Sequence, residues 1–385
     1  MKKILNLLFI LLTFLIVGCV PNEELESSIP YITFNAKSEQ KIVFYGPNSE
    51  FEMEYSVGEG EWESWHNFLM PISFGGNKGS LRLRGKNPEG TNGYSFVFKN
   101  KDVFVTCTGD IRTLIDYKNY RTTNTSKANF SALFMNCDVL ASAPDLPITK
   151  LSEGCYARMF WGCKNLPRIP KLPAKKLTTN CYESMFAYCT GLIVTPELPA
   201  TTLAESCYKE MFTYCKRLTT MPKLPATKLA ENCYEGMFAG CAALTNVQEL
   251  PATVLTEKCY ADMFRECTSL ETAPKLSAKV LEKYCCSHMF MDCTALKQSP
   301  ILHAKELRVG CYNEIFMGCS QLSVVTMLAT KPNSEWNIFT LDSWLERAGS
   351  EAATRTIYVA NEEIANAIID CCPIQPDWRS GIKVR

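Results

Sequence analysis

The sequence contains few of the side chains on which catalytic and metal sites are usually built. Its 385 residues include only 3 histidines, which are not clustered with acidic residues. It also has no G-x-S-x-G motif and no glycine-rich loop of the phosphate-binding type. Asp and Glu are numerous, but nothing distinguishes two of them as a glycosidase-type pair from ordinary solvated residues. We therefore expect no enzymatic activity, no cofactor and no metal site.

The chain also lacks an excess of either charge and a second long hydrophobic run. Lys and Arg total 40, as do Asp and Glu, and no basic stripe is present. Because nucleic-acid binding requires a basic footprint, we expect no nucleic-acid partner. Beyond the N-terminal run, no segment is long and apolar enough to span a bilayer, so we expect membrane contact only through an N-terminal anchor.

The N-terminal residues have the layout of a bacterial lipoprotein signal. Lys2 and Lys3 precede an apolar run, too short to span a bilayer, that ends in Ile-Val-Gly before Cys19. We predict a signal peptide over residues 1–18 and lipidation of Cys19, with an ordinary cleaved signal and a chance cysteine as the alternative.

An acidic run follows within the expected tether, residues 19–30. It resembles a signal that exports lipoproteins to the outer face of the Gram-negative outer membrane, and the alternative is a solvated acidic tether. The expected location is the outer membrane, with the protein exposed at the cell surface.

Residues 31–107 have the pattern of short β-strands separated by glycine-rich turns. Three segments alternate apolar and polar residues with period two: 51–57, 81–84 and 94–98. Seven or eight strands at this spacing predict a small β-sandwich of immunoglobulin-like layout. Trp62, Trp65 and His66 fall close together in this region, and we interpret them as core residues rather than ligand contacts.

What the sequence does contain is a repeat of 26 residues from Asn129 to Leu322. One cysteine column consists of Cys137, Cys163, Cys189, Cys215, Cys241, Cys267, Cys293 and Cys319. A leucine column follows three residues behind it, and a second cysteine column consists of Cys155, Cys181, Cys207, Cys233, Cys259, Cys285 and Cys311. An uninterrupted repeat of this length predicts a solenoid, in which each repeat buries its apolar face against its neighbours.

Each repeat contains two expected elements, a helix and an extended segment. In the unit 229–251, Cys233, Met237 and Cys241 recur every four residues, which predicts an amphipathic helix of about three turns. The extended segment that follows usually carries two prolines, so any parallel strand there is only a few residues long. This alternation predicts an α/β solenoid of the leucine-rich-repeat type.

The residue between the two prolines alternates in charge along the repeats. The column consists of Asp145, Lys171, Glu197, Lys223, Glu249 and Lys275. Because equivalent residues of neighbouring repeats lie side by side in a solenoid, we expect each charge to face an opposite one.

Both ends of the repeat array differ from its middle. Residues 109–131 keep the apolar spacing with altered residue types, which predicts an N-terminal cap within a solenoid domain of residues 108–325. Residues 326–385 lose the repeat and predict a C-terminal cap over the otherwise exposed core. Within this cap we expect a helix at 341–348, a strand at 356–359 and a helix at 362–371.

The spacing of the 20 cysteines favours neither disulfides nor metal sites. The two cysteines of a repeat would lie about 12 Å apart along a helix, and stacked helices about 8–10 Å apart, whereas a disulfide needs Cα atoms within about 7 Å. We therefore expect the column cysteines to be free, buried thiols. A disulfide is left open for the four that lie outside the columns and the anchor: Cys107, Cys286, Cys371 and Cys372.

One place in the repeats carries aromatic residues in three consecutive copies. The two residues after each repeat phenylalanine should face solvent at the end of the expected helix, and most copies have small or charged residues there. Trp161, Tyr188 and Tyr214 occur there instead, so we predict a strip of aromatic rings that binds a ligand. The alternative is that these rings pack against the flanking chain or fill gaps between helices.

The pattern C-Y-x-x-M-F-x-x-C-x-x-L, followed by the proline segment, resembles the BspA-like subclass of leucine-rich repeats. The resemblance covers the central half of the chain, together with the lipoprotein signal and the strands before the repeats. It implies a right-handed solenoid in a surface lipoprotein of Bacteroides-type bacteria that adheres to host proteins. We therefore expect a lipid-anchored recognition protein with a host or matrix protein as its partner. A glycan-binding lipoprotein and a structural spacer without a specific ligand are the alternatives.

Overall fold

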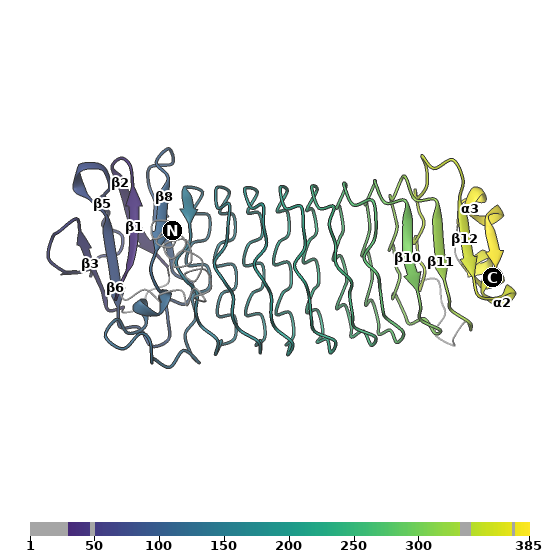
Figure 1. The fold of residues 1–385 in the computed structure, drawn as a ribbon, viewed down its shortest axis with the longest axis horizontal. Coiled ribbons are helices and arrows are strands. Elements are labelled where there is room, and N and C mark those ends of the chain that lie inside the picture. The colour runs from purple at the N-terminus through teal and green to yellow at the C-terminus, as the bar shows by residue number, and fades with distance from the viewer. Residues whose placement is uncertain (1–29, 47–50, 332–339, 372–373) are drawn as a thin grey trace, which may run out of the picture.

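The molecule is elongated, with a β-rich part, a row of repeated coils and a small C-terminal part in succession (Figure 1). The computed structural model describes residues 30–46, 51–331, 340–371 and 374–385. The predicted lipoprotein signal and Cys19 lie outside these residues. Within the described part, strands outnumber helices, and α-helix is confined to α2 (Glu362–Cys371) and α3 (Pro376–Ser380). The row of coils is compatible with a repeat solenoid, and we call residues 129–322 the repeat stack.

The β-rich part, which we call the β-module (residues 31–108), contains two sheets. The larger sheet has the order β4–β3–β6–β1–β8–β9, and the smaller has the order β5–β2–β7. These strands are β1 (Ile32–Ala36), β2 (Gln40–Tyr45), β3 (Met53–Val57), β4 (Glu63–Ser64), β5 (Ile72–Phe74), β6 (Leu81–Gly85), β7 (Ser95–Phe98), β8 (Val105–Thr108) and β9 (Leu140–Ser142). Strands β3, β6 and β7 coincide with the three segments that alternate in the sequence, with β6 one residue longer, which confirms those strand predictions.

The core of the β-module is built from phenylalanine rings. The ring of Phe34 in β1 lies 5.4 Å from Phe96 and 5.6 Å from Phe98 in β7, centroid to centroid, so the two sheets pack against each other. Phe134 belongs to the first repeat, yet its ring lies 5.5 Å from that of Phe96. Because β8 also pairs in parallel with β9 of the first repeat, the β-module and the repeat stack share one sheet and one core.

The three-turn helix predicted in each repeat is wrong, because these residues form consecutive four-residue turns. The N–H of Met159 donates to the carbonyl of Tyr156, and the N–H of Cys163 donates to that of Phe160, both at 3.1 Å. Each bond joins residue i+3 to residue i, and the third residue of the first of these turns, Arg158, has φ 55°. A positive φ at that place is the pattern of a type II turn.

The other backbone N–H groups of these turns bond between repeats. The N–H of Tyr156 donates to the carbonyl of Cys181, and that of Phe160 to the carbonyl of Met185, each at 2.9 Å. Neighbouring coils therefore lie at about the 4.8 Å spacing of β-strands, closer than the 8–10 Å of stacked helices. Alternating bonds within a coil and to the next coil satisfy the buried backbone without a helix.

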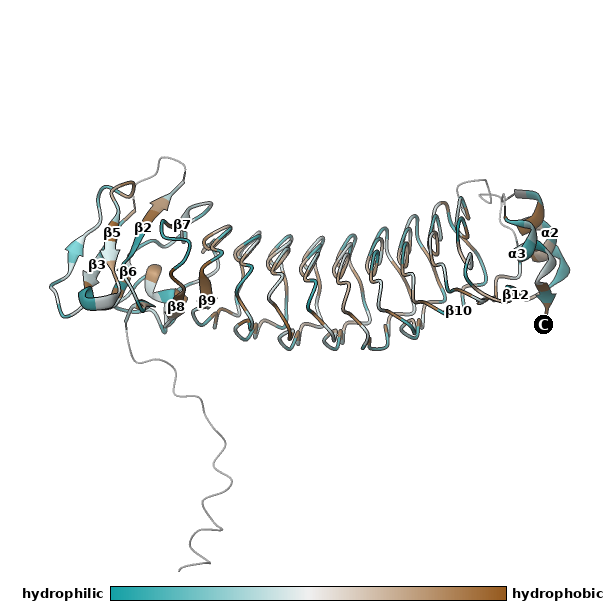
Figure 2. Cartoon of the chain, turned by 90° about the horizontal axis from the view of Figure 1, so that it is seen from above, coloured by the Kyte–Doolittle hydropathy of each residue, from teal (hydrophilic) through white to brown (hydrophobic). Residues whose placement is uncertain are grey.

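Identical side chains stack inside the coils. The rings of Tyr156 and Tyr182 lie 6.0 Å apart at 9°, and those of Phe160 and Phe186 lie 5.4 Å apart at 2°. The leucine column and both cysteine columns are buried along the repeat stack. Figure 2 shows the coils side by side, with β8, β9 and β10 along one side of the row.

The C-terminal part continues the stack with a parallel sheet. Its strands, in spatial order, are β10 (Gln298–Leu302), β11 (Val324–Met327), β12 (Thr356–Val359) and β13 (Ile382–Val384). The strand predicted at 356–359 and the helix predicted at 362–371 are confirmed as β12 and α2. The helix predicted at 341–348 is wrong, because this segment forms another turned coil, in which Ser343 has φ 47° and the carbonyl of Trp344 accepts from the N–H of Phe316 at 3.0 Å.

Candidate recognition surface

The three aromatic residues singled out in the sequence lie together on the repeat stack. The ring of Tyr188 lies 5.1 Å from that of Trp161 and 5.1 Å from that of Tyr214. The two tyrosines are stacked at 18°, whereas Trp161 is tilted by 55°. We call these three residues the aromatic strip.

Turn geometry, rather than the end of a helix, positions the strip. Tyr188 and Tyr214 occupy the positive-φ place of the second turn in their repeats, with φ 61° and 56°. The preceding repeat has Gly162 at this place, and the adjacent residue Trp161 supplies the ring instead. Neighbouring repeats thus present their rings at the spacing of the coils.

A glycine beyond Tyr214 leaves room for the tyrosine ring. A Cβ atom at Gly240, in the next repeat, would lie 2.5 Å from the Tyr214 ring, so no other residue fits there without a shift. The Tyr214 hydroxyl reaches past this glycine and donates to the Glu266 carboxylate at 3.0 Å, two repeats away. Burial and the Glu266 carboxylate together raise the pKa of the Tyr214 hydroxyl.

Exposure along the strip is graded. Tyr188 in its centre is 40% exposed, and Trp161 and Tyr214 are half-buried. None of the three rings is a core residue, unlike the tyrosines and phenylalanines of the inner columns. Only the two tyrosines are stacked, so the strip presents ring surface together with polar atoms to solvent.

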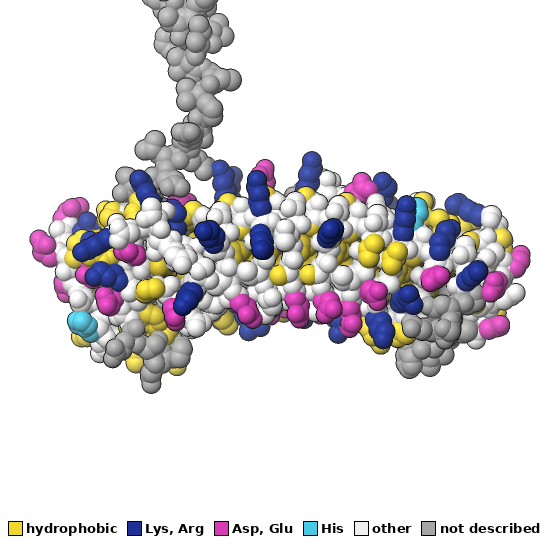
Figure 3. All heavy atoms as spheres, turned by 90° about the horizontal axis from the view of Figure 1, so that it is seen from below, with side chains coloured by type: hydrophobic (Ala, Val, Ile, Leu, Met, Phe, Trp, Pro, Cys, Tyr) yellow, Lys and Arg dark blue, Asp and Glu magenta, His cyan; other side chains and the backbone are white. Residues whose placement is uncertain are grey.

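One pair of residues from the charged column forms an ion pair between neighbouring repeats. Lys275 Nζ lies 2.8 Å from Glu249 Oε1 in the preceding repeat. Figure 3 shows basic and acidic side chains along the same face of the molecule, with apolar side chains between them. The face seen there presents both signs of charge.

The residues 62, 65 and 66 of the β-module lie in three different surroundings. Trp65 is buried, as predicted, and its Nε1 donates to the Asn67 carbonyl at 3.1 Å. Trp62 is only half-buried and stacks on the Arg84 guanidinium, which lies 3.9 Å from its ring centroid. His66 is exposed, so its interpretation as a core residue is wrong.

The column cysteines are free and buried. In the cysteine column that begins at Cys137, the thiols donate to phenylalanine carbonyls. The Cys189 thiol, for example, donates to the carbonyl of Phe160 in the preceding repeat at 3.1 Å. Burial raises the pKa of the Cys189 thiol from 9.0 to about 12. The distance of 8–10 Å between stacked helices, on which we based the prediction of free thiols, is wrong, because the coils lie about 4.8 Å apart. The thiols are free for a different reason. Stacked side chains point in parallel, however, whereas a disulfide brings Cβ atoms to about 3.8 Å.

The cysteines outside the columns are described in part. Cys107 and Cys286 are free and buried, so neither forms a disulfide. Cys372 and the side chain of Cys371 lie outside the described residues.

The described residues contain neither a metal-binding cluster nor a membrane-spanning helix. Among them, no group of three or more His, Cys, Asp and Glu side chains is placed to hold a metal ion. No helix within the same residues is long and apolar enough to cross a membrane.

Comparisons of the chain with protein-family models, with curated proteins and with solved structures found no match.

Proposed function

We propose that this chain is a lipid-anchored recognition protein of the bacterial outer membrane, exposed at the cell surface, whose repeat stack binds a protein ligand. The lipoprotein pattern that ends at Cys19 supports the anchor and the location. The C-Y-x-x-M-F repeat supports a right-handed, BspA-like leucine-rich-repeat solenoid built from turns, with a host or matrix protein as partner. The proposal includes no catalytic activity and no cofactor.

The observation that carries the proposal is the partly exposed aromatic strip. Tyr and Trp dominate the energetic centres of protein interfaces because they combine a large apolar ring with a polar atom. The stacked tyrosines cover part of each other's ring faces, on which a sugar ring would pack, and leave edges and hydroxyl groups for side chains of a protein. This arrangement favours a protein over a glycan as the ligand of the strip.

The repeat stack also reduces the cost of binding. Hydrogen bonds between coils fix the backbone that carries Trp161, Tyr188 and Tyr214, as in the bond of 2.7 Å from the Tyr188 N–H to the Thr213 carbonyl. Because side chains held in place before binding lose less conformational freedom on binding, more of the contact energy remains as affinity.

The test is a binding screen of the full chain in detergent against immobilised fibronectin, fibrinogen and collagen. The triple variant Trp161→Ala, Tyr188→Ala, Tyr214→Ala should bind the captured protein at least about tenfold more weakly, as expected for loss of a hot spot. Tyr284→Ala is the matched control, because Tyr284 is an exposed tyrosine of the repeat stack, at 37%, outside the strip.

The melting temperature separates recognition from structure. We expect the melting temperature of the triple variant to be close to that of the wild type, since none of the three rings belongs to the buried core. Unchanged capture together with a large loss of stability would assign the rings to packing and overturn the proposal.

A further inference from the structure

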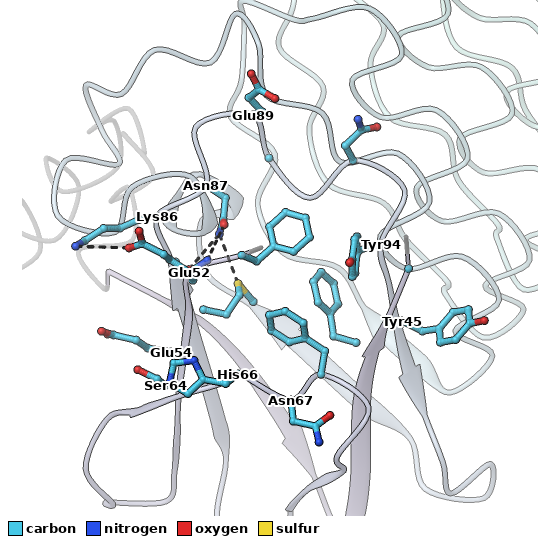
Figure 4. A pocket seen from close by; sticks show the side chains of 18 of the residues that line it. Tyr45, Glu52, Glu54, Ser64, His66, Asn67, Lys86, Asn87, Glu89 and Tyr94 are labelled. Atoms are coloured by element: carbon cyan, nitrogen blue, oxygen red, sulfur yellow. Dashed lines mark hydrogen bonds and ion pairs between the residues drawn. The ribbon is translucent and has the colours of Figure 1, made fainter. Parts of the chain in front are cut away.

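A large hollow lies on one side of the β-module, apart from the aromatic strip. Its volume is about 1450 Å³, above the roughly 300–1,000 Å³ of typical small-molecule pockets. Three segments form its wall: residues 44–46 with 51–54, residues 64–69, and residues 85–94. Figure 4 shows aromatic rings in its middle and polar side chains around them. A hollow of this size suits an oligomer of several units rather than a single small molecule.

The rings in the middle are accessible and differ in arrangement from the strip. Phe51 lies 4.5 Å from Tyr94 at 85° and 6.2 Å from Phe68 at 65°, centroid to centroid. Phe51 and Phe68 are half-buried, whereas Tyr94 is buried beneath them. Rings that meet edge to face do not cover one another as stacked rings do, so apolar ring surface remains for a ligand.

The base of the hollow is held rigidly by Asn87. Its side-chain nitrogen donates to the carbonyls of Glu52 and Leu114 at 3.2 and 3.0 Å, and its oxygen accepts from the Glu52 N–H at 3.1 Å. These bonds tie Glu52, which precedes β3, and Leu114 to the segment that follows β6. The base of the hollow is therefore held by side-chain hydrogen bonds before any ligand arrives.

Two of the three carboxylates on the rim, those of Glu52 and Glu54, are paired with basic side chains, and the third, Glu89, is exposed. Lys86 Nζ lies 3.9 Å from Glu52 Oε2, and Arg84 Nε lies 2.6 Å from Glu54 Oε2. Exposed amides, Asn67 and Asn92, add uncharged donors and acceptors to the same rim. Such a rim offers many hydrogen bonds, and Glu89 alone gives it a weak negative field.

We propose that this hollow binds a neutral oligosaccharide. The C–H faces of its sugar rings pack on Phe51 and Phe68, and its hydroxyl groups bond with the rim amides and carboxylates. Paired charges favour an uncharged ligand over a sulfated glycan or a strongly basic peptide, since an ionic ligand needs an opposite field. The β-module and the repeat stack then recognise different ligands.

The experiment is titration calorimetry of the full chain in detergent with cellohexaose, a mannan oligosaccharide, a xylan oligosaccharide and, as comparators, a heparin oligosaccharide and a basic aromatic peptide. At least one neutral oligosaccharide should bind. Phe68→Leu keeps an apolar side chain but removes the ring, and should weaken binding about tenfold. Asn92→Ala, at an exposed rim position, should also weaken it without affecting folding. Tyr188→Ala, in the aromatic strip, is the control and should leave sugar binding unchanged.

Salt separates the ligand classes. Binding of a neutral sugar should persist in 1 M NaCl, where the Debye length is about 3 Å. The proposal is overturned if no neutral oligosaccharide binds, if only the heparin or the peptide binds, or if Asn92→Ala and a folded Phe68→Leu variant bind as the wild type does. Because the strip variants are measured in parallel, failure here is distinguishable from failure of the proposed protein recognition.

Discussion

Cysteine suits the stacked columns because its side chain is small, can be buried, and still donates a weak hydrogen bond. The Cys241 thiol, for example, is fully buried and donates to the Phe212 carbonyl at 3.1 Å. That carbonyl belongs to the preceding coil, so each thiol of the column links two repeats. Alanine would remove this bond, and serine would bury a more strongly polar group.

Burial of the thiols predicts a marked pH dependence of stability. The pKa values of Cys181, Cys189 and Cys241 rise from 9.0 in ordinary surroundings to about 12, because burial disfavours the thiolate. Between these values the unfolded chain has released protons that the folded chain retains, so stability is complete below about pH 9 and is lost as the pH rises towards 12. Each thiol contributes up to about 1.4 kcal/mol per pH unit in this range.

Urea unfolding in the presence of reductant measures this effect. We expect the urea midpoint to fall steeply between pH 8.5 and pH 10.5, and a thiol reagent to react with the column cysteines only after unfolding. An unchanged midpoint, or rapid reaction of these thiols in the folded protein, would show that they are accessible to solvent.

Lipidation is a second prediction for a single residue. If Cys19 ends a lipoprotein signal, cells that express the chain and take up a labelled fatty acid should label the wild type but not Cys19→Ser. Cys107→Ser is no suitable control because Cys107 is buried in the core, so an exposed substitution such as Ser64→Ala serves instead. Equal labelling of the wild type and Cys19→Ser would contradict the anchor.

At the scale of elements, the alternating strands were predictable and the repeat element was not. A period of two identifies β3, β6 and β7 because one face of each strand packs on the phenylalanine core. A spacing of four residues, as between Cys233 and Met237, fits both a helix and consecutive four-residue turns. Apolar spacing alone therefore does not decide between them.

A local signal for the turns was nevertheless present in the sequence. Gly236 and Gly240 lie four residues apart in the unit interpreted as a helix, and both have positive φ, at 59° and 70°. Glycine is unfavourable within a helix and favourable at a positive φ. The bond from Tyr214 to Glu266 was not predictable because it spans two repeats and depends on turn geometry.

Lys258 tests the turn directly, since it is exposed and has φ 52°. In a helix, a change from Lys to Gly would cost up to about 1 kcal/mol, whereas at a positive φ glycine relieves strain. We therefore expect Lys258→Gly to keep or raise the free energy of unfolding. Lys258→Val should lower it by about 1–2 kcal/mol, because β-branched residues rarely adopt this conformation.

Equilibrium unfolding in urea provides the measurement for both variants. Lys279→Gly, at an exposed position outside the positive-φ places, is the control and should not be stabilising. If Lys258→Gly destabilises more than Lys258→Val does, the repeats are helical and the turn description is wrong.

At the scale of the whole molecule, the shared core makes the β-module and the repeat stack one continuous structure. Phe134 packs on Phe34 at 6.3 Å, and β9 extends the larger sheet of the β-module. The proposed sugar site and the aromatic strip are therefore held on one rigid body rather than on parts joined by a linker. The molecule would then carry both proposed recognition surfaces outward from the proposed lipid anchor.

The most direct test of the account is hydroxyl-radical footprinting of the full chain, with and without the protein ligand captured in the screen. Oxidation of Tyr188 and Trp161 should fall several-fold in the complex, because the ligand covers the aromatic strip. Tyr45 of the β-module, which is 64% exposed, and Tyr284 should be oxidised equally in both states. Protection of Tyr45 or Tyr284, with the strip oxidised as in the free protein, would contradict the claim that the strip is the recognition surface.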